Sequence, residues 1–503
     1  MQLHIPAAFF ALAIAASAAK PILEQAGLAK DPASGLITRA PGARPTSAQL
    51  YQMENTRYGM FIHFGINTFI NQEWTDGSVP IEKYAPKEIA ADEWVLAAKN
   101  AGMSHVVLVC KHHDGFCNWP TKHDEMQYSV GHASNKTDVV KAVSNACRKH
   151  GVRFAVYYSC WDRRWDAKHA EDYKQDRAAT NKAYTDYMVA QVEELLSQYG
   201  PVTEIWIDGS WHKKLEEWGF DRVYDAVKRH QPLCQVAINW NIGHPDNVDS
   251  TAHLKEQREG FPIRYFPSDF RLGDPELPAF PDPKIFTHGG KQFYMPFEST
   301  ICLNDQWFWN AGDKGLKSVD ELEKLFLQAT AQNNLLLLNS PPGPDGHMRP
   351  ATLERLVQLR ERLGLKIGGP FPKNTAAVKA TATATSVWTK DQGFGPELAV
   401  DENPGTRWAS ETPVCAITQE FAAPTRIERV ILREYGESGH YRIGKFILEA
   451  QVGDSWKTLV DGTTVGASKQ LKFDPVLTKL MRLRILEASE PPSLSAFRAL
   501  EAD

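Results

Sequence analysis

The sequence lacks any block of like charge. Its 56 basic and 61 acidic residues are interspersed over 503 positions and leave a formal net charge of −5. Nucleic acids and anionic membranes are bound by concentrated basic patches, so neither is expected as a partner. The ligand is therefore expected to be small or uncharged.

The sequence also lacks the cysteine and histidine spacings of common metal sites. Its seven cysteines include no C-x-x-C pair and their number is odd, which is typical neither of a disulfide scaffold nor of a zinc site. The patterns H-x-H and H-E-x-x-H are missing as well. We therefore expect catalysis without a metal or other cofactor.

Long apolar runs are missing after the first 20 residues. The opening stretch "MQLHIPAAFFALAIAASAAKP" contains an apolar run too short to span a bilayer, and it ends in small residues that fit an A-x-A cleavage pattern. We expect residues 1–20 to be a signal peptide and residues 21–45 an N-terminal linker. A frayed N-terminal helix is the alternative for the first segment. The protein is predicted to be secreted or periplasmic, without membrane insertion.

A length of 503 residues predicts more than one domain. Between residues 46 and 368, short apolar runs such as "HVVLVCKHHDGF", "TEIWIDG" and "FYMPFES" alternate with longer amphipathic segments. Strands that are apolar on both faces are typical of a parallel sheet covered by helices, so the pattern predicts an α/β fold, a (β/α)8-like TIM barrel. A doubly wound sheet is the alternative, but no Gly-rich phosphate motif follows the first strand.

The pattern changes after the barrel. Residues 369–382 are rich in Gly, Pro, Ala and Thr and are expected to form a linker. Residues 383–503 contain many short alternating segments and no long helical pattern. Such spacing predicts a second, all-β domain, a jelly-roll sandwich.

Polar or aromatic residues close several of the predicted barrel strands. They are His63, Lys111, His112, His113, Asp114, Tyr157, Tyr158, Asp208, Trp240 and Glu298. The carboxyl ends of the strands in such a barrel meet at one face, where chemistry takes place. His112 and His113 are adjacent, so on one strand they would point to opposite faces and could not both face one metal ion. Packed core histidines are the alternative interpretation.

Asp208 closes the strand in "IWIDGSW". An ionised carboxylate in an apolar run costs several kcal/mol unless it is paired or used. Hydrolysis of a glycosidic bond needs two carboxyl groups, one ionised and one protonated, and Asp208 and Glu298 are the candidates. The alternatives are a helix N-cap for Asp208 and a structural ion pair for Glu298.

Five segments together resemble glycoside hydrolase family 29, the α-L-fucosidases. They are "YGMFIHFGINTF" with a following "EW", "KHHDGFCNWPT", "DVVKAVSNACRKHGVRFAVYYS", "EIWIDG" and "NNLLLLNSPPGPDG", and they cover nearly all of residues 50–365. The resemblance implies a (β/α)8-like barrel that hydrolyses terminal α-L-fucosides of oligosaccharides or glycoconjugates with retention of configuration. Another retaining exo-glycosidase with a galactoside-like substrate, or a glycan-binding protein without catalysis, are the alternatives.

The resemblance also implies roles for individual residues. Asp208 falls at the nucleophile of the family's W-x-D-G motif. Sugar contacts are implied for His63, Glu73, Trp74, His112, His113, Tyr158 and Trp206, and Trp240 is added as a further contact. For the acid/base, "PFESTICLNDQWFW" resembles a family segment and favours Glu298, although Phe297 stands where the family usually has Trp. "SDFRLGDPELP" makes Glu276 the alternative.

The C-terminal segment resembles discoidin or F5/8 type C domains through "ELAVDENPGTRWASE", "APTRIERVIL" and "KFILEAQVGDSWKTL". Such domains often bind glycans and often hold a structural calcium. Asp401, Asn403 and Thr406 could supply oxygen ligands to calcium, and a plain turn is the alternative. A scaffold role without glycan binding stays open.

Overall fold

The computed structural model describes residues 23, 26–244, 257–368, 380–389, 393–401, 406–435 and 440–502. The predicted signal peptide and Asn403 lie outside these residues. The chain divides into two compact units, residues 1–317 with 333–354 and residues 318–332 with 355–503. Within the described residues, no helix has both the length and the apolar character needed to cross a membrane.

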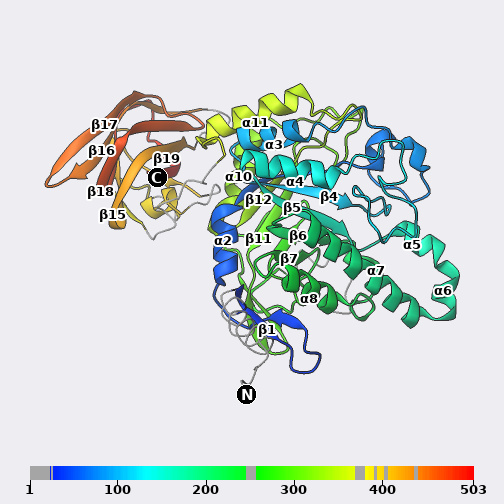
Figure 1. The fold of residues 1–503 in the computed structure, drawn as a ribbon. Helices are drawn as coiled ribbons and strands as arrows, with labels where there is room; N and C mark the ends of the chain where they lie inside the picture. Colours follow the sequence, from blue (N-terminus) through cyan, green and yellow to red (C-terminus); the bar gives the residue numbers. More distant parts are fainter. Residues whose placement is uncertain are drawn as a thin grey trace, which may run out of the picture. The chain divides into compact units, whose positions relative to one another are not determined.

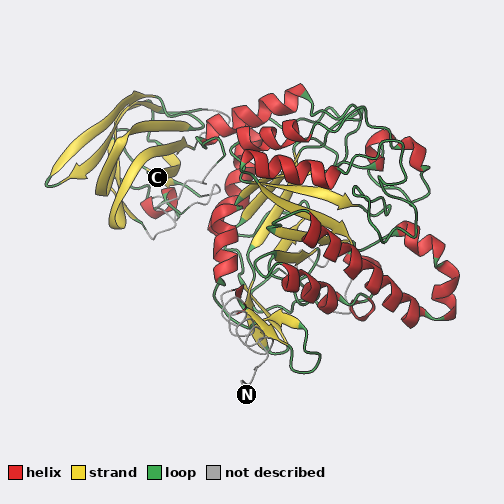
Figure 2. Cartoon of the chain, in the orientation of Figure 1, coloured by secondary structure: helices red, strands yellow, loops and turns green. Residues whose placement is uncertain are grey.

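The first unit is built on an eight-stranded parallel sheet with the order β7-β6-β5-β4-β3-β12-β11-β8. Helices lie around this sheet (Figures 1 and 2). The strands are β3 (Tyr58–Ile62), β4 (His105–Lys111), β5 (Arg153–Ser159), β6 (Glu204–Asp208), β7 (Gln235–Ile238), β8 (Arg271–Gly273), β11 (Phe297–Cys302) and β12 (Leu335–Asn339). Most are buried along their whole length, because helices cover one face of the sheet and side chains inside the barrel pack against the other. The predicted (β/α)8-like barrel is confirmed.

The helices of this unit follow the strands in alternation. They are α2 (Ser47–Asn55), α3 (Ala91–Asn100), α4 (Val139–His150), α5 (Arg163–Lys168), α6 (Ala170–Gln175), α7 (Arg177–Gln198) and α8 (Phe220–His230); α11 (Pro350–Leu363) runs from this unit into the next. Helix α4 shows how the sequence sets its ends. The Asp138 side chain accepts a hydrogen bond from the Lys141 N–H, and Gly151 ends the helix in the left-handed conformation.

The second unit combines α10 (Val319–Thr330) with an antiparallel all-β fold. Its strands are β13 (Thr381–Ala384), β14 (Trp408–Ala409), β15 (Cys415–Glu434), β16 (Ile443–Val452), β17 (Ser455–Thr463), β18 (Lys469–Ala488) and β19 (Ser493–Glu501). They pair in the order β14-β19-β15-β18-β16-β17, with β13 beside β15. Register shifts in β15 bend this long strand, and the sheet closes over a core that includes Trp408, Phe446 and Phe497.

The predicted calcium loop is only partly described. Thr406 Oγ1 donates a hydrogen bond to Asp401 Oδ2 over 2.7 Å. A plain turn and a calcium loop are both compatible with this contact, so the calcium site stays a prediction.

Two segments differ from the expectation. The predicted linker 21–45 contains a hairpin of β1 (Leu28–Lys30) and β2 (Ile37–Arg39). The run "FYMPFES", expected as one strand, is divided: β10 (Lys291–Tyr294) pairs with β9 (Ile285–His288), and β11 begins after Pro296. Proline has no N–H to donate to a ladder, so it separates the two strands.

This division moves Glu298 to the other end of the barrel. It is the second residue of β11 and pairs in register with Leu335, the first residue of β12. The prediction that it lies at the carboxyl ends of the strands, as the acid/base, is therefore wrong. The error arose because the predicted strand, residues 293–299, ends three residues before β11 does.

At this opposite end, Glu298 belongs to a fully buried polar cluster with His105 and Glu204. Trp206 Nε1 donates to Glu298 Oε1 over 2.6 Å, and Gln52 Nε2 donates to Glu204 Oε2 over 2.8 Å. Burial and the neighbouring Glu204 carboxylate raise the pKa of Glu298 well above its ordinary range. Glu298 is therefore protonated in the folded protein and acts as a packed hydrogen-bonding group.

We expect Glu298→Gln to change the pH dependence of stability. Above the ordinary glutamate pKa of 4.5 the unfolded chain releases a proton that folded Glu298 keeps. As the pH rises, this group therefore lowers the free energy of unfolding of the wild-type protein by about 1.4 kcal/mol per pH unit, until the pH passes the raised pKa of Glu298. Glutamine resembles the protonated form, so the variant should lose this slope.

Urea unfolding of both proteins measures the effect between about pH 5 and about pH 8, where the unfolded glutamate is ionised. Parallel stability curves for the two proteins would show that Glu298 is ionised in the fold.

Candidate active site

The candidate site lies at the carboxyl ends of the parallel strands. Asp208 ends β6, Asn339 ends β12, and His63, His112 and His113 follow β3 and β4 directly. In Figure 1 the arrows of β4 and β6 point to the side of the barrel where α5 lies. The predicted convergence of these polar groups on one face is thus seen in the structure.

Asp208 is buried, with 4% of its surface exposed, and three donors hold its carboxylate. Tyr157 Oη donates to Oδ2 over 2.7 Å, and the Gly209 N–H and Asn239 Nδ2 donate to Oδ1 over 2.8 and 3.0 Å. A carboxylate has about four lone-pair positions, so one stays available to a ligand. The side chain does not cap a helix, and within the described residues no lysine or arginine lies within 4 Å of it.

The backbone after Asp208 needs a glycine. Gly209 has φ of +89°, and a Cβ there would lie 2.5 Å from the Trp161 Cβ. This close approach turns the chain sharply and directs the Asp208 carboxylate toward Tyr157 and His113.

Two histidines each present an acceptor nitrogen to the site. His63 Nδ1 donates to Asn339 Oδ1 over 2.7 Å, because the amide Nδ2 of Asn339 donates to the Trp307 carbonyl. His113 Nδ1 lies 2.6 Å from Ser159 Oγ, whose proton goes to the Trp161 carbonyl, so His113 Nδ1 is the donor. Each ring therefore keeps a lone pair on Nε2, and His113 Nε2 lies 3.5 Å from Asp208 Oδ2.

Burial keeps these histidines neutral. It lowers the pKa of His63 to about 3, that of His112 well below the ordinary range, and that of His113 against the opposing effect of Asp208. The His112 ring lies 4.4 Å from that of His113 and stacks on Tyr157 at 5.7 Å. Both residues lie beyond the end of β4, so the expectation that they face opposite sides of a strand is wrong.

A second carboxyl group enters the site from β8. Asp274 follows this strand directly and is partly exposed. Burial raises the pKa of Asp274 well above its ordinary range, and the negative charges of Asp208, Glu276 and Glu73 raise it further. The raised pKa favours the protonated form of Asp274 next to the Asp208 carboxylate.

The two predicted glutamates of this region have other contacts. Glu276 Oε2 accepts a hydrogen bond from the Asp274 N–H over 2.5 Å, which turns it toward its own loop. Glu73 Oε1 accepts a hydrogen bond from the Trp307 N–H, and burial raises the pKa of Glu73. Both lie close enough to act on Asp274 electrostatically.

Several tryptophans lie in or near the candidate site. Trp74 is 59% exposed and its ring lies 6.2 Å from that of His113. Trp240 pairs with Trp211 at 4.5 Å. Trp206 is buried in the barrel interior beside Phe61 and Tyr157. The exposed ring of Trp74 offers a flat apolar surface to a ligand.

The structure places three of the predicted site residues elsewhere. Glu298 and Trp206 are both buried, and Trp206 Nε1 donates to Glu298 Oε1, so the predicted sugar contact of Trp206 is wrong. Tyr158 Oη lies 2.8 Å from Lys111 Nζ and 2.8 Å from Gln191 Oε1, on the side of β5 that faces α7. Its neighbour Tyr157 reaches Asp208 instead, because successive strand residues alternate between faces. The prediction for Tyr158 is therefore corrected to Tyr157.

Sequence analysis also missed Asn239, Ser159, Asn339 and Asp274 as members of the site. Ser159 pairs in register with Asp208, so strand alternation could have indicated Ser159, and with it Tyr157 rather than Tyr158 as the contact on the same face. Asp274 is in the quoted segment "SDFRLGDPELP", but the short strand before it has no clear sequence pattern. Its position depends on the pairing of β8 with β11.

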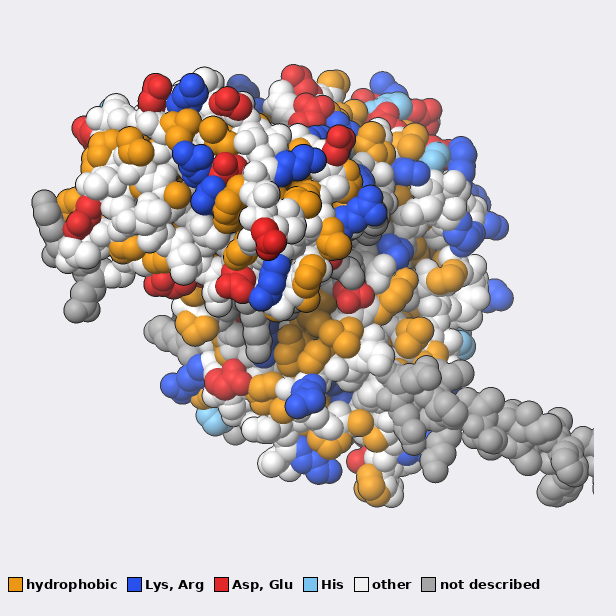
Figure 3. Space-filling view, turned by 90° about the vertical axis from the view of Figure 1, so that its left-hand side faces the viewer, with side chains coloured by type: hydrophobic (Ala, Val, Ile, Leu, Met, Phe, Trp, Pro, Cys, Tyr) orange, Lys and Arg blue, Asp and Glu red, His pale blue; other side chains and the backbone are white. Residues whose placement is uncertain are grey.

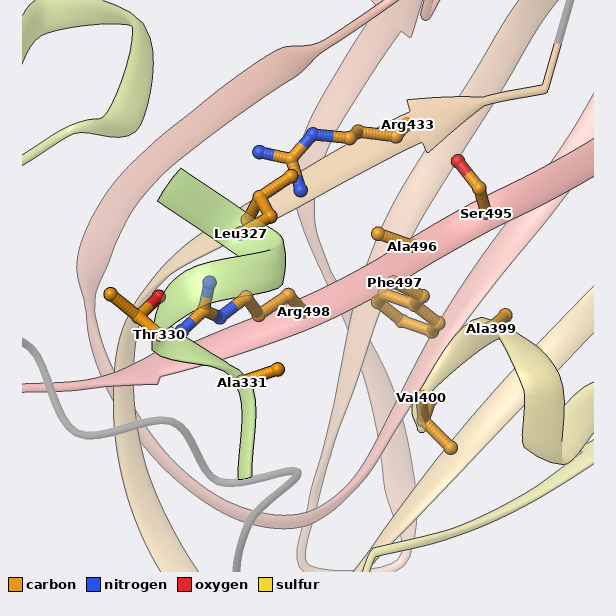
Figure 4. Close-up of a pocket in the computed structure, with 10 residues that line it drawn as sticks. All are labelled: Leu327, Thr330, Ala331, Ala399, Val400, Arg433, Ser495, Ala496, Phe497 and Arg498. Carbon is orange, nitrogen blue, oxygen red and sulfur yellow. The ribbon is translucent and has the colours of Figure 1, made fainter. Parts of the chain in front are cut away.

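A cavity in the second unit suits a sugar less well. A cavity of about 40 Å3 in the second unit is lined by residues that include Leu327, Phe497 and Arg433 (Figure 4). Ligand pockets are usually about 300–1,000 Å3, and Arg433 is already paired with Glu323 over 2.8 Å. Figure 3 shows acidic and basic side chains interspersed over the face it displays, without a large patch of one sign.

The geometry at the barrel mouth can bind and polarise a neutral polyol. Neutral imidazoles accept hydrogen bonds from hydroxyls, and the exposed Trp74 can cover an apolar face. Asp208 is held by a phenol, a backbone N–H and an amide, whereas burial raises the pKa of Asp274 well above its ordinary range. Two carboxyls in opposite protonation states are what hydrolysis of a glycosidic bond requires.

Comparisons with known proteins agree with this geometry. Residues 43–364 match the family model described as α-L-fucosidase, and residues 381–497 match that of the F5/8 type C domain. The chain is 28% identical over 466 residues to α-L-fucosidase 1 of Arabidopsis thaliana, covering 90% of this chain and 86% of that protein.

Solved structures share the fold. A glycoside hydrolase family 29 member from a rumen bacterium is 24% identical, with a TM-score of 0.53 over 92% of this chain and 78% of that one. A family 29 fucosidase of Ruminococcus gnavus, solved with fucose, is 19% identical, with a TM-score of 0.50 over 95% of this chain and 99% of that one. By its matching domains, this chain belongs to the α-L-fucosidases of glycoside hydrolase family 29 and carries an F5/8 type C domain.

Proposed function

We propose that the protein is an exo-α-L-fucosidase that removes terminal α-L-fucose from oligosaccharides or glycoconjugates by a retaining double displacement. The observation that carries this proposal is the buried Asp208 carboxylate, held by Tyr157, Gly209 and Asn239 beside neutral histidines. No metal or other cofactor takes part in the proposed reaction. Export from the cytoplasm, which the first 20 residues predict, is part of the proposal.

In the first step, Asp208 attacks the anomeric carbon and forms a covalent fucosyl ester while the leaving oxygen departs. In the second step, water attacks this carbon and releases Asp208. The donors on both Asp208 oxygens fix its orientation before the substrate arrives, which lowers the cost of reaching the reactive geometry. His63, His112, His113 and Trp74 would bind the sugar hydroxyls and its apolar face.

Asp274 is our candidate for the acid/base. A general acid must be protonated near neutral pH, and burial together with Asp208, Glu276 and Glu73 holds the Asp274 pKa high. When the ester forms, the negative charge of Asp208 disappears, so the pKa of Asp274 falls. This change suits its second task, because Asp274 must then take a proton from the attacking water.

We expect Asp208→Gly to lower kcat on aryl α-L-fucosides by about a thousandfold or more, because the nucleophile is lost. Added azide can occupy the space of the carboxylate and attack the anomeric carbon directly. The product should be a fucosyl azide of inverted configuration, identified by NMR.

Asp221→Gly, on the exposed first turn of α8, is the control and should keep wild-type kcat. Full activity of Asp208→Gly would exclude Asp208 as the nucleophile. Equal wild-type rates on aryl α-L-fucosides and aryl galactosides would contradict the proposed specificity.

We expect Asp274→Asn to slow fucosides with poor leaving groups by about a hundredfold or more and activated aryl fucosides much less, since only poor leaving groups need a proton. The basic limb of the wild-type kcat/KM profile should disappear. Azide should yield a fucosyl azide of retained configuration, because the ester still forms.

Glu276→Gln and Glu298→Gln provide the comparison, measured with the same two substrates. Both should affect the two substrates alike. A loss that depends on the leaving group in Glu276→Gln, but not in Asp274→Asn, would assign the acid/base to Glu276.

A further inference from the structure

A groove with a cavity of about 630 Å3 lies beside the candidate site. We propose that this groove binds an anionic substituent, a carboxylate or a sulfate, on the sugar that leaves when fucose is removed. Arg163 is the residue that would contact this substituent. The inference rests on the proposed function and names the class of substrate for the same site.

The groove is continuous with the site. It is lined by segments that follow β3, β4, β5 and β6, so it opens on the same end of the barrel as Asp208. Trp161 joins the two: its ring lies 5.4 Å from that of His113, and its Cβ lies against Gly209. A leaving group attached to fucose at Asp208 can therefore extend into the groove.

Arg163 is held at the inner part of this groove. Its backbone N–H donates to the His113 carbonyl over 2.9 Å, and its guanidinium lies 5.1 Å from the centre of the Trp161 ring. Its positive charge helps to lower the pKa of His113, which shows that it acts on the candidate site electrostatically. Among the described residues, no carboxylate lies within 4 Å of the Arg163 guanidinium.

Most acidic residues of the groove already have basic partners. Glu125 lies 3.7 Å from Lys168 and 3.3 Å from His169. Asp166 lies 2.8 Å from His212 and 3.8 Å from Lys213. These pairs leave little negative charge to repel an anionic ligand.

The remaining charges give a positive surplus. Arg164 donates to the Gly77 carbonyl over 2.7 Å and lies over the Tyr128 ring, so neutral groups hold it. Asp76 is the remaining carboxylate of the groove lining, and it accepts hydrogen bonds from Ser78. The groove lining holds three carboxylates (Asp76, Glu125, Asp166) and three basic side chains (Arg163, Arg164, Lys168), and Lys213, which pairs with Asp166, adds a fourth basic group. One positive charge is therefore left for a ligand.

A guanidinium suits both ligand groups in the proposal. It is planar, always charged, and can donate two parallel hydrogen bonds to a carboxylate or a sulfate. A neutral leaving sugar cannot replace the water around Arg163 with an equivalent interaction. An anionic leaving sugar should therefore be preferred.

The test uses three disaccharides, in which fucose is joined through the same linkage to glucose, to glucuronic acid or to glucose 6-sulfate. We expect wild-type kcat/KM to be about tenfold higher for one or both anionic substrates than for the glucose substrate. Arg163→Gln should remove this ratio, and Arg163→Lys should restore part of it. Added salt should reduce the ratio, because the groove is open to solvent.

Arg222→Gln is the matched control, because it removes the same charge from an exposed residue of α8 that pairs with Asp186. It should keep the wild-type ratio. Equal rates on all three substrates, or an anionic preference that survives in Arg163→Gln, would overturn the inference. The glucose substrate and an aryl fucoside report the proposed function separately, since fucosidase activity on them does not require the groove.

Discussion

The site depends on holding the buried Asp208 carboxylate with neutral donors, and within the described residues no lysine or arginine lies within 4 Å of it. Burying a charge costs several kcal/mol, and Asp208 meets this cost with a phenol, a backbone N–H and an amide. A lysine or arginine in their place would form an ion pair and lower the nucleophilicity of the carboxylate. These donors come from Tyr157 on β5, from Gly209 after β6 and from Asn239 after β7. The three neighbouring strands must therefore be in register for the arrangement to form.

Glu298 and Asp274 show how the same chemistry has different outcomes at the two ends of the barrel. Burial raises the pKa of both carboxyls, and in each a nearby carboxylate adds to the effect. Glu298 is fully buried at the closed end with Trp206 and Glu204, where a ligand cannot reach it. Asp274 lies at the partly exposed mouth, where its proton can reach a ligand. A raised pKa therefore indicates function only when the position also gives access to substrate.

Much of the barrel could be predicted from sequence because its strands are buried on both faces, and continuous apolar runs such as those of β4, β6 and β12 are distinct. The residues that directly follow these runs, among them His63, His112 and His113, were placed correctly for the same reason. Short strands could not be predicted in the same way. Three residues of β8 and the proline between β10 and β11 set the positions of Asp274 and Glu298, and neither is decided by local pattern. Tyr157 and Tyr158 lie on opposite faces of β5, and because this strand is apolar or aromatic on both faces, its pattern does not tell which of the two faces the barrel interior.

The charges around the mouth also explain why its histidines can stay neutral beside an aspartate. Asp208 alone would favour protonation of His113, but burial and the positive Arg163 act in the opposite direction and prevail. A protonated His113 would pair with Asp208 and compete with the anomeric carbon for its electrons. Neutral His113 instead keeps its Nε2 lone pair for a sugar hydroxyl, while Ser159 holds the proton side of the ring in place. The positive charge of Arg163 next to the site therefore helps to keep His113 from pairing with Asp208.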